Sequence, residues 1–198
     1  SCQIESFQFA DGTAWTLQQI KDACSVQLGT EADDTLTGRN DFTTNTLYGN
    51  GGNDTLNGAS SSYLNGGAGN DTLTSTAGVS STLIGGDGND IIDTRGRDLV
   101  NGGAGDDTLK ELYGNGTAYI FNIGDSRDVV TDTGGADTFR FGEGILASDL
   151  KLVMQGLDVV VNYPSGEITI KDFFKVTNTG YSCQIESFQF ADGTAWTL

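Results

Sequence analysis

The sequence predicts an all-β protein in which a parallel β coil is joined to a small antiparallel β-rich module with one short helix. Three observations indicate this fold. Four glycine-rich nonapeptides of the form G-G-x-G-x-D-x-U-x, where U is a large apolar residue, begin 17 to 19 residues apart. Within and between them an apolar residue recurs every eight to ten residues, as expected of short strands that share one core. After about residue 116 glycine becomes scarcer and β-branched and aromatic segments replace it.

We expect three parts along the chain. Residues 1–27 contain a strand-like IESFQF, an ADG turn and a short helical stretch, WTLQQIKDAC, expected to cap the coil. Residues 28–115 hold the glycine-rich repeats. Residues 116–198 form the β-rich module, with strands expected in AYIF, DTFRF, LKLVM, DVVVNY and EITIKDFF, and with a tight turn at Tyr163-Pro164-Ser165-Gly166.

The two ends of the chain are identical. Residues 1–17, SCQIESFQFADGTAWTL, recur unchanged as residues 182–198, an offset of 181 residues. This indicates a tandem array whose neighbouring units are partners of this one, with a deliberate duplication as the alternative. Cys2 and Cys183 then occupy the same repeat position, so that Cys2 and Cys24 form either a disulfide bridge or two separate thiols.

Composition narrows the function classes. The chain has 198 residues, 27 of them acidic and 10 basic, and a formal charge of −17. Such a surface disfavours nucleic acid and anionic membranes and attracts cations. The chain has no histidine, which excludes Ser-His-Asp and Cys-His catalysis and disfavours a catalytic zinc site. Because no apolar run approaches the roughly 20 residues that span a bilayer, we expect no membrane insertion.

The nonapeptides have the chemistry of a calcium site. Glycine permits positive φ angles and a close approach of the backbone to an ion, while carbonyl groups and the sixth-position aspartate supply oxygen ligands. Calcium takes six to eight such oxygens in flexible geometry, whereas magnesium demands a stricter octahedron. We therefore expect several Ca²⁺ ions, held by Asp34, Gly49, Asn50, Gly51, Gly52, Asp54, Gly66, Gly67, Ala68, Gly69, Asp71, Gly85, Gly86, Asp87, Gly88, Asp90, Gly102, Gly103, Ala104, Gly105, Asp107 and Asp128.

The repeats alternate between two edges of the coil. The eighth-position residues of the complete copies, and the apolar residues of the degenerate copies between them, should point into one core: Leu36, Leu56, Leu73, Ile92 and Leu109, with Leu47, Leu64, Leu83 and Val100. The sixth positions on one edge are then acidic: Asp34, Asp54, Asp71, Asp90, Asp107 and Asp128. Those on the other edge are mostly neutral: Asn45, Ser62, Ser81, Asp98, Thr117 and Asp137. We expect a file of at most about five calcium ions along the first edge, and a second edge that is largely metal-free and closed by Ser, Thr and Asn hydrogen bonds.

The two ends of this file are less regular than its middle. Thr30 and Ala32 replace the usual glycines before Asp34, and Ser126 replaces one before Asp128. Without calcium the repeats would behave as a flexible Gly/Asn/Asp-rich linker, because stacked aspartates repel one another and each thin strand buries little apolar surface.

These motifs resemble those of the RTX family of secreted bacterial proteins over about residues 29–140, and the nonapeptide is that family's calcium-binding repeat. The run from DTGGADTFRF to DFF, followed by IESFQFADGTAWTL, resembles the haemolysin-type calcium-binding-related module. The resemblance implies a right-handed parallel β-roll, calcium between the loops, and type I export of an unfolded chain that folds outside the cell or at the cell surface. The two cysteines and the degenerate alternate loops depart from the family pattern.

The sequence favours a non-catalytic, calcium-dependent extender unit of a large adhesin- or toxin-like protein. One alternative is a module that binds a glycan or another surface, for which Trp15, Trp196 and Tyr181 are candidates, although they are more readily explained as core or turn residues. Another is the secretion or folding module of an exported hydrolase. Gly124-Asp125-Ser126 superficially resembles an esterase motif, but it also fits a repeat loop and lacks a histidine.

Overall fold

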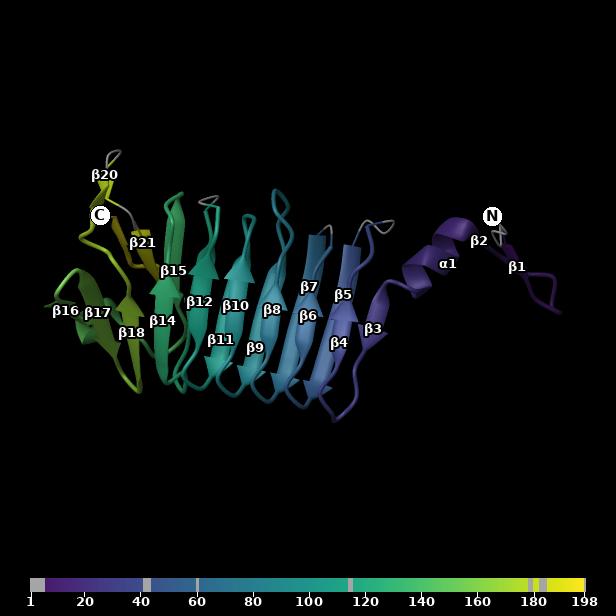
Figure 1. Ribbon diagram of the computed structural model, residues 1–198, viewed down its shortest axis with the longest axis horizontal. Coiled ribbons are helices and arrows are strands. Elements are labelled where there is room, and N and C mark those ends of the chain that lie inside the picture. Colours follow the sequence, from purple (N-terminus) through teal and green to yellow (C-terminus); the bar gives the residue numbers. More distant parts are fainter. Residues whose placement is uncertain are drawn as a thin grey trace.

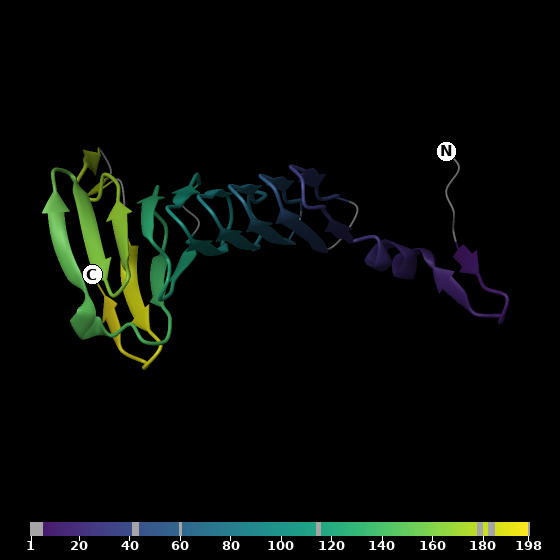
Figure 2. The same cartoon turned by 90° about the horizontal axis from the view of Figure 1, so that it is seen from below.

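The computed structural model describes residues 6–40, 44–59, 61–113, 116–177, 180–181 and 185–197. Over these residues the protein is all-β, with a parallel β-solenoid of about six turns, a small antiparallel sheet and one short α-helix. This confirms the fold class expected from the sequence. In Figure 1 the turns follow one another along the long axis, and Figure 2 shows that each turn contributes strands to two facing layers.

Each layer of the solenoid is a nine-stranded sheet. Sheet I has the order β16 (Lys151–Gln155), β17 (Asp158–Tyr163), β18 (Gly166–Ile170), β14 (Arg127–Thr131), β12 (Thr108–Glu111), β10 (Ile91–Thr94), β8 (Thr72–Thr74), β6 (Thr55–Asn57) and β4 (Thr35–Thr37). Sheet II has the order β22 (Ala195–Thr197), β21 (Ile185–Phe190), β15 (Asp137–Phe141), β13 (Ala118–Phe121), β11 (Leu99–Ala104), β9 (Thr82–Asp87), β7 (Ser61–Ala68), β5 (Thr44–Gly51) and β3 (Val26–Leu28).

Parallel pairing stacks equivalent positions of successive turns. Leu56 pairs with Leu73 in sheet I, and Leu47 pairs with Leu64 in sheet II. The expected inward residues from Leu47 to Leu109 are completely buried, and Leu36, in the first turn, is partly buried against them. The parallel pairing continues from β12 through β14 to β18 in sheet I, and from β13 through β15 to β21 in sheet II. The domain boundary expected at residue 115 therefore stays a prediction that rests on composition.

The core changes character toward the C-terminus. Leu and Ile give way to a cluster of aromatic rings, and the Phe139 ring centroid lies 4.9 Å from that of Phe121 and 5.5 Å from that of Phe188. Strands β16, β17 and β18 form an antiparallel meander beside β14, and its second hairpin turns between Tyr163 and Gly166 as expected. A short 3₁₀ helix, Ala147–Asp149, precedes it, and β19 (Val176–Thr177) pairs with β20 (Gly180–Tyr181).

The N-terminal segment forms β1 (Ser6–Gln8), β2 (Ala14–Thr16) and α1 (Leu17–Ala23). Trp15 and Thr16, expected in the helix, belong to β2 instead, and the helix starts where Thr16 and Gln19 form a capping box through reciprocal side-chain to backbone hydrogen bonds. Figure 1 shows the hairpin and helix extending beyond β3, away from the roll, so that the capping role of residues 1–27 stays a prediction. Cys24 is an exposed free thiol, whereas Cys2 and Cys183 lie outside the described residues. Within the described ranges no helix is long and apolar enough to cross a membrane.

Candidate metal centre

The loops that lead from sheet II to sheet I form the first edge of the roll, and those that return from sheet I to sheet II form the second edge. Along the first edge the sixth-position aspartates are joined in one ladder. The backbone N–H of Asp54 donates to Oδ1 of Asp71 at 2.7 Å, and the N–H of Asp71 donates to Oδ1 of Asp90 at 2.7 Å. The same bond links Asp34 to Asp54, Asp90 to Asp107, and Asp107 to Asp128. All six expected aspartates therefore lie in one continuous file.

The second carboxylate oxygen of each central aspartate has no donor. Oδ2 of Asp54, Asp71, Asp90 and Asp107 is buried and accepts no hydrogen bond from the described protein groups. These residues are only 1–2% exposed. A buried carboxylate oxygen without a partner is costly, so each of the four positions calls for a cation or a proton.

First-position glycines leave room for these oxygens. A Cβ on Gly49 would collide with Oδ2 of Asp54 and with the carbonyl oxygen of Gly66 in the next turn. Gly66 and Gly85 have the same relation to their own aspartates and to the following turn. A carboxylate oxygen and a carbonyl oxygen of the next turn thus border one small space, a donor set that suits calcium.

The other loop positions stack closely from turn to turn. Gly67 and Gly86 have φ angles of 112° and 122°, and a Cβ on either would overlap a carbonyl group of the preceding turn. Asn50 occupies the equivalent position with φ at 75°, and its side chain donates to the carbonyl oxygen of Gly29 at 2.8 Å. The third-position residues Gly51, Ala68, Asp87 and Ala104 pair in register. Gly52, Gly69, Gly88, Gly103 and Gly105 also have positive φ.

The two ends of the file differ from its middle. The backbone N–H and the hydroxyl of Thr30 both donate to Oδ2 of Asp34, so this oxygen already has partners, and these bonds lower the pKa of Asp34. At the other end, the next strand places Ile168 beside Asp128 in the pairing register. The irregular loops noted in the sequence therefore coincide with the physical ends of the file.

Without a counter-charge, burial makes the file electrostatically unfavourable. Burial raises the pKa of Asp90 to about 7 and that of Asp107 to about 6, against hydrogen bonds from Asp71 and Asp90 that lower them. Burial also raises the pKa of Asp128 to about 8, and repulsion from Asp107 adds to it. A divalent ion between successive turns would remove this cost by restoring charge balance.

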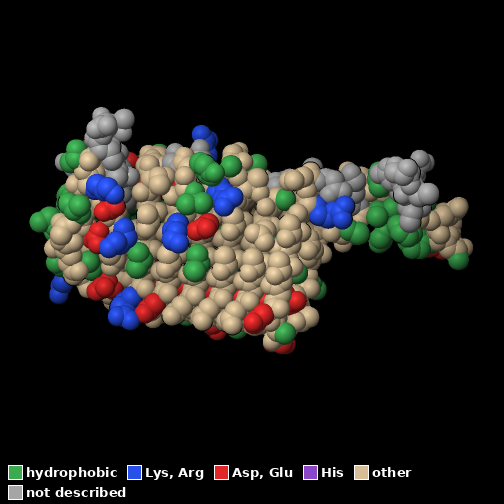
Figure 3. Space-filling view, viewed as in Figure 1, with side chains coloured by type: hydrophobic (Ala, Val, Ile, Leu, Met, Phe, Trp, Pro, Cys, Tyr) green, Lys and Arg blue, Asp and Glu red, His purple; other side chains and the backbone are tan. Residues whose placement is uncertain are grey.

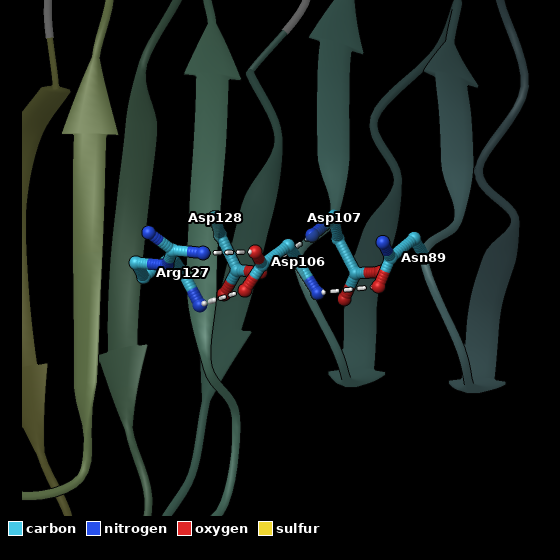
Figure 4. A network of polar contacts seen from close by, with 5 residues as sticks. All are labelled: Asn89, Asp106, Asp107, Arg127 and Asp128. Carbon is cyan, nitrogen blue, oxygen red and sulfur yellow. Dashed lines mark hydrogen bonds and ion pairs between the residues drawn. The ribbon is translucent and has the colours of Figure 1, made fainter.

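A second ladder along the first edge was not expected from the sequence. The fifth-position side chains Asp33, Asn53, Asn70 and Asn89 each accept from the backbone N–H of the next turn at 2.7–3.0 Å, in the opposite sense to the aspartate ladder. Figure 4 shows the last steps, in which Arg127 contacts Asp106 through its backbone N–H and its guanidinium group. The recurring Asn or Asp before the sixth-position Asp was the available signal. In Figure 3 acidic side chains follow the lower rim of the roll, where these loops lie.

The second edge is closed by protein hydrogen bonds over most of its length. The Asn45 amide donates to the carbonyl oxygen of Ala59 at 2.6 Å, and the Ser62 hydroxyl donates to the same oxygen at 3.0 Å. Asp98 uses both oxygens: Oδ1 accepts from the Ser81 N–H at 2.8 Å and Oδ2 accepts from the Ser75 hydroxyl at 2.6 Å.

At the C-terminal end of this edge the pattern changes. Glu111, Asp132 and Asp137 form a buried acidic group in which one oxygen of each lies within 4.8 Å of the others. Burial is the main cause that raises the pKa of both Asp132 and Asp137, and repulsion within the group adds to it. Of these three residues only Asp137 was noted from the sequence, because the other two lie outside the sixth position.

The chain matches models of two families. The RTX calcium-binding nonapeptide repeat matches residues 28–62, 58–79 and 80–109, and the haemolysin-type calcium-binding protein related domain matches residues 158–198. Among solved structures, extracellular lipase LipA from Serratia marcescens aligns with 17% identity and a TM-score of 0.41 over 79% of this chain. The chain spans 39% of that lipase. No curated protein sequence matches the chain. The β-roll of this chain therefore carries RTX calcium-binding nonapeptide repeats, and a haemolysin-type calcium-binding-related domain follows it.

Proposed function

We propose that this chain is a calcium-dependent structural unit, an extender, of a large secreted adhesin- or toxin-like RTX protein. The observation that carries the proposal is the row of four buried Oδ2 oxygens on the first edge. In calcium-poor surroundings the burial of these oxygens without a counter-charge opposes folding, and calcium binding between successive turns supplies the missing stability. Such a unit stays unfolded during type I export and folds outside the cell.

We assign the calcium ligands to the residues expected from the nonapeptides. The ions lie on the first edge between turns, coordinated by sixth-position carboxylates and loop carbonyls. The ion positions lie between the loops of Asp54, Asp71, Asp90 and Asp107, where each aspartate has an Oδ2 without a donor. We expect the position next to Asp34 to bind calcium most weakly, because Thr30 already donates to the Oδ2 of Asp34.

A calcium titration followed by circular dichroism tests this function. We expect a chelated chain at neutral pH to lack the β signal and to gain it cooperatively as calcium rises into the ~10⁻⁴–10⁻³ M range of extracellular calcium modules. Magnesium at the same concentration serves as the control and should not replace calcium. An identical spectrum with calcium and with chelator would exclude calcium-dependent folding.

The extender role is supported by two copies of one hairpin in different surroundings. Phe7 pairs with Trp15 in β1–β2, and Phe188 pairs with Trp196 in β21–β22 in the same register. In the C-terminal copy Phe188 is 1% exposed and packs in the core, whereas Phe7 and Trp15 are 45% and 44% exposed. The apolar face of β1–β2 thus matches the place that β21–β22 fills, as expected if each hairpin completes the module of the preceding unit and leads into the helix of the next.

A protein with two consecutive units tests this junction. Acrylamide should quench Trp15 of the first unit strongly, while the tryptophan at the junction should be shielded as Trp196 is. Trp→Phe substitutions leave one tryptophan at a time and make the comparison direct. A junction tryptophan as accessible as Trp15 would contradict the proposed array.

Two other functions remain as alternatives to be tested. A glycan- or surface-binding module would use exposed aromatic rings. Trp15 is exposed, Trp196 packs against the core, and the side chain of Tyr181 lies outside those described. A glycan array measures this activity directly. The hydrolase-linked alternative concerns the parent protein, and we propose no catalytic role for this chain.

A further inference from the structure

An acidic cluster lies on the second edge, where the roll joins the C-terminal module. Glu111 ends β12, Asp132 directly follows β14, and Asp137 begins β15. Their side chains are buried, and one oxygen of each lies within 4.8 Å of the other two. None of these residues belongs to the four complete nonapeptides, and the cluster lies on the edge opposite the aspartate ladder.

Two oxygens in this cluster have no donor. Oδ1 of Asp132 accepts from the N–H of Gly134 at 2.7 Å, and Oδ1 of Asp137 accepts from the N–H of Thr117. Oδ2 of each aspartate is buried and accepts nothing from the described N–H and O–H groups. Asp132 is 4% exposed and Asp137 is fully buried, so water does not substitute freely for the missing partner.

Asp98 shows that burial on this edge does not by itself leave carboxylate oxygens without partners. It occupies the same sixth position and is 3% exposed. Its Oδ2 nevertheless accepts from the Ser75 hydroxyl at 2.6 Å and from the N–H of Gly96 at 3.1 Å. The difference is the residue at the end of the sheet I strand. A hydroxyl donor follows β8, whereas Glu111 and Asp132 place further acceptors at the equivalent positions of later turns.

A fourth carboxylate approaches from the C-terminal module. The pairing of β15 with β21 shifts register between Asp137 and Thr138, and Glu186 lies at the resulting irregularity. One Glu186 oxygen accepts from the N–H of Asp137 at 2.7 Å. Irregularities of this kind commonly redirect a side chain next to a site. Here the shift brings another negative group beside the cluster.

We propose that Glu111, Asp132 and Asp137 bind one calcium ion on the second edge, outside the file on the first edge. Oxygen-only donors from three carboxylates suit a hard divalent cation, and two positive charges balance this cluster better than one shared proton does. The ion links the last turns of the roll to β15, which in turn pairs with β21. It therefore fixes the C-terminal module on the roll.

Calcium content after equilibrium dialysis tests the site. We expect Asp132→Asn to bind one ion fewer than the unsubstituted chain, because the amide keeps the size of the side chain but not its charge. Asp98→Asn is the matched control on the same edge and should bind the full number. Asp132→Asn could instead bind the full number of ions, or melt at a higher temperature than the unsubstituted chain when both are measured in calcium. Either result would show that the cluster is only a group of buried acids.

A crystal of the unsubstituted chain soaked with Tb³⁺, whose anomalous scattering locates it, decides the case even if the variant fails to fold. We expect a peak between Asp132 and Asp137. Peaks on the first edge alone would overturn this site and leave the proposed calcium file intact. A peak at the cluster without peaks on the first edge would support this site and contradict the file.

Discussion

On the first edge of the roll each central aspartate keeps one oxygen without a donor, whereas on the second edge Asp98 uses both of its oxygens. Both edges belong to the same turns and share the same parallel register. They differ in the position that directly precedes the loop. On the first edge this position is glycine in every central turn, as in Gly49 and Gly66. On the second edge it is glycine only in the early turns, as in Gly58, and later turns carry side chains there, such as Ser75 and Glu111.

This comparison shows how one repeat produces two kinds of edge. A glycine followed by a sixth-position aspartate, as on the first edge, leaves a space bordered by oxygens, which calcium can fill, so that stability depends on the ion. A hydroxyl at the same position donates to the sixth-position side chain and closes the loop without a metal. When the side chain is itself an acid, as at Glu111 and Asp132, carboxylates gather on the second edge, and Oδ2 of Asp132 and of Asp137 accepts no hydrogen bond from the described groups.

The strongest test fills the space on one edge and compares it with the other. In Gly66→Ala the new Cβ would collide with Oδ2 of Asp71. We expect the calcium concentration for half-maximal folding to rise on the order of 30-fold or more, since overpacking costs about 1–3 kcal/mol. Gly58→Ala is the matched second-edge change, because its Cβ would lie 3.2 Å from the Ser62 hydroxyl. It should raise this midpoint less than about threefold. Equal effects of the two substitutions would contradict the comparison.

Asparagine substitutions separate loss of a ligand from loss of a hydrogen bond. Asp90→Asn keeps an oxygen for the N–H of Asp71 but removes one negative charge from the file. We expect a weaker response to calcium, by about tenfold, without loss of stability in chelator. In Asp98→Asn an amide NH₂ faces the donors of Ser75 or Ser81, which should cost about 1–3 kcal/mol in calcium. Denaturant unfolding with and without calcium measures both effects. If Asp98→Asn lost a calcium ion, the second edge would not be closed by hydrogen bonds there.

The pKa shifts on the first edge predict an effect of pH. The raised values, about 6 to 8 for Asp107, Asp90 and Asp128, lie above the roughly 4 of an unfolded aspartate. The metal-free roll therefore binds more protons than the unfolded chain. Its stability is greatest below pH ~4 and is lost as the pH rises through about 6 to 8. We expect acidification to restore β structure in chelator and, because protons compete for the ligands, to weaken calcium binding. Circular dichroism across pH 4–8 checks both directions, and a chelated chain more ordered at pH 8 than at pH 5 would contradict them.

The sequence was sufficient to predict the repeating part of the molecule. Regular spacing identifies the inward residues from Leu47 to Leu109 and the aspartate file. This is possible because the parallel register aligns each loop position with the same position of the next turn. The fifth position is equally regular and is occupied by residues such as Asn53 and Asn70. Its role is a contact between turns, in which Asn53 accepts from the N–H of Asn70, and the sequence pattern alone does not specify that contact.

Two features depend on tertiary context and could not be predicted in this way. Glu111 and Asp132 occupy strand ends whose alignment with Asp137 follows from pairing register, and the degenerate second-edge loops do not reveal that register. The identical segments around Phe7 and Phe188 adopt the same hairpin, yet one is exposed and the other buried. No property of the local sequence can distinguish two identical segments.

The smallest expected effect concerns the exposed end of the fifth-position ladder. The Arg127 guanidinium lies 2.7 Å from Asp106 (Figure 4), but its side chain is 72% exposed. Its backbone N–H, which also donates to Asp106, remains in any substitution, so the ladder itself should persist in Arg127→Gln. We expect a slight fall in melting temperature at low salt that disappears at about 0.5 M NaCl, where exposed charges are screened. Arg127→Lys retains the charge and should behave like the unsubstituted chain. If the melting temperature of Arg127→Gln stayed lower at high salt, the Arg127 side chain would stabilise this edge by packing. The ion pair would then not act independently of the ladder.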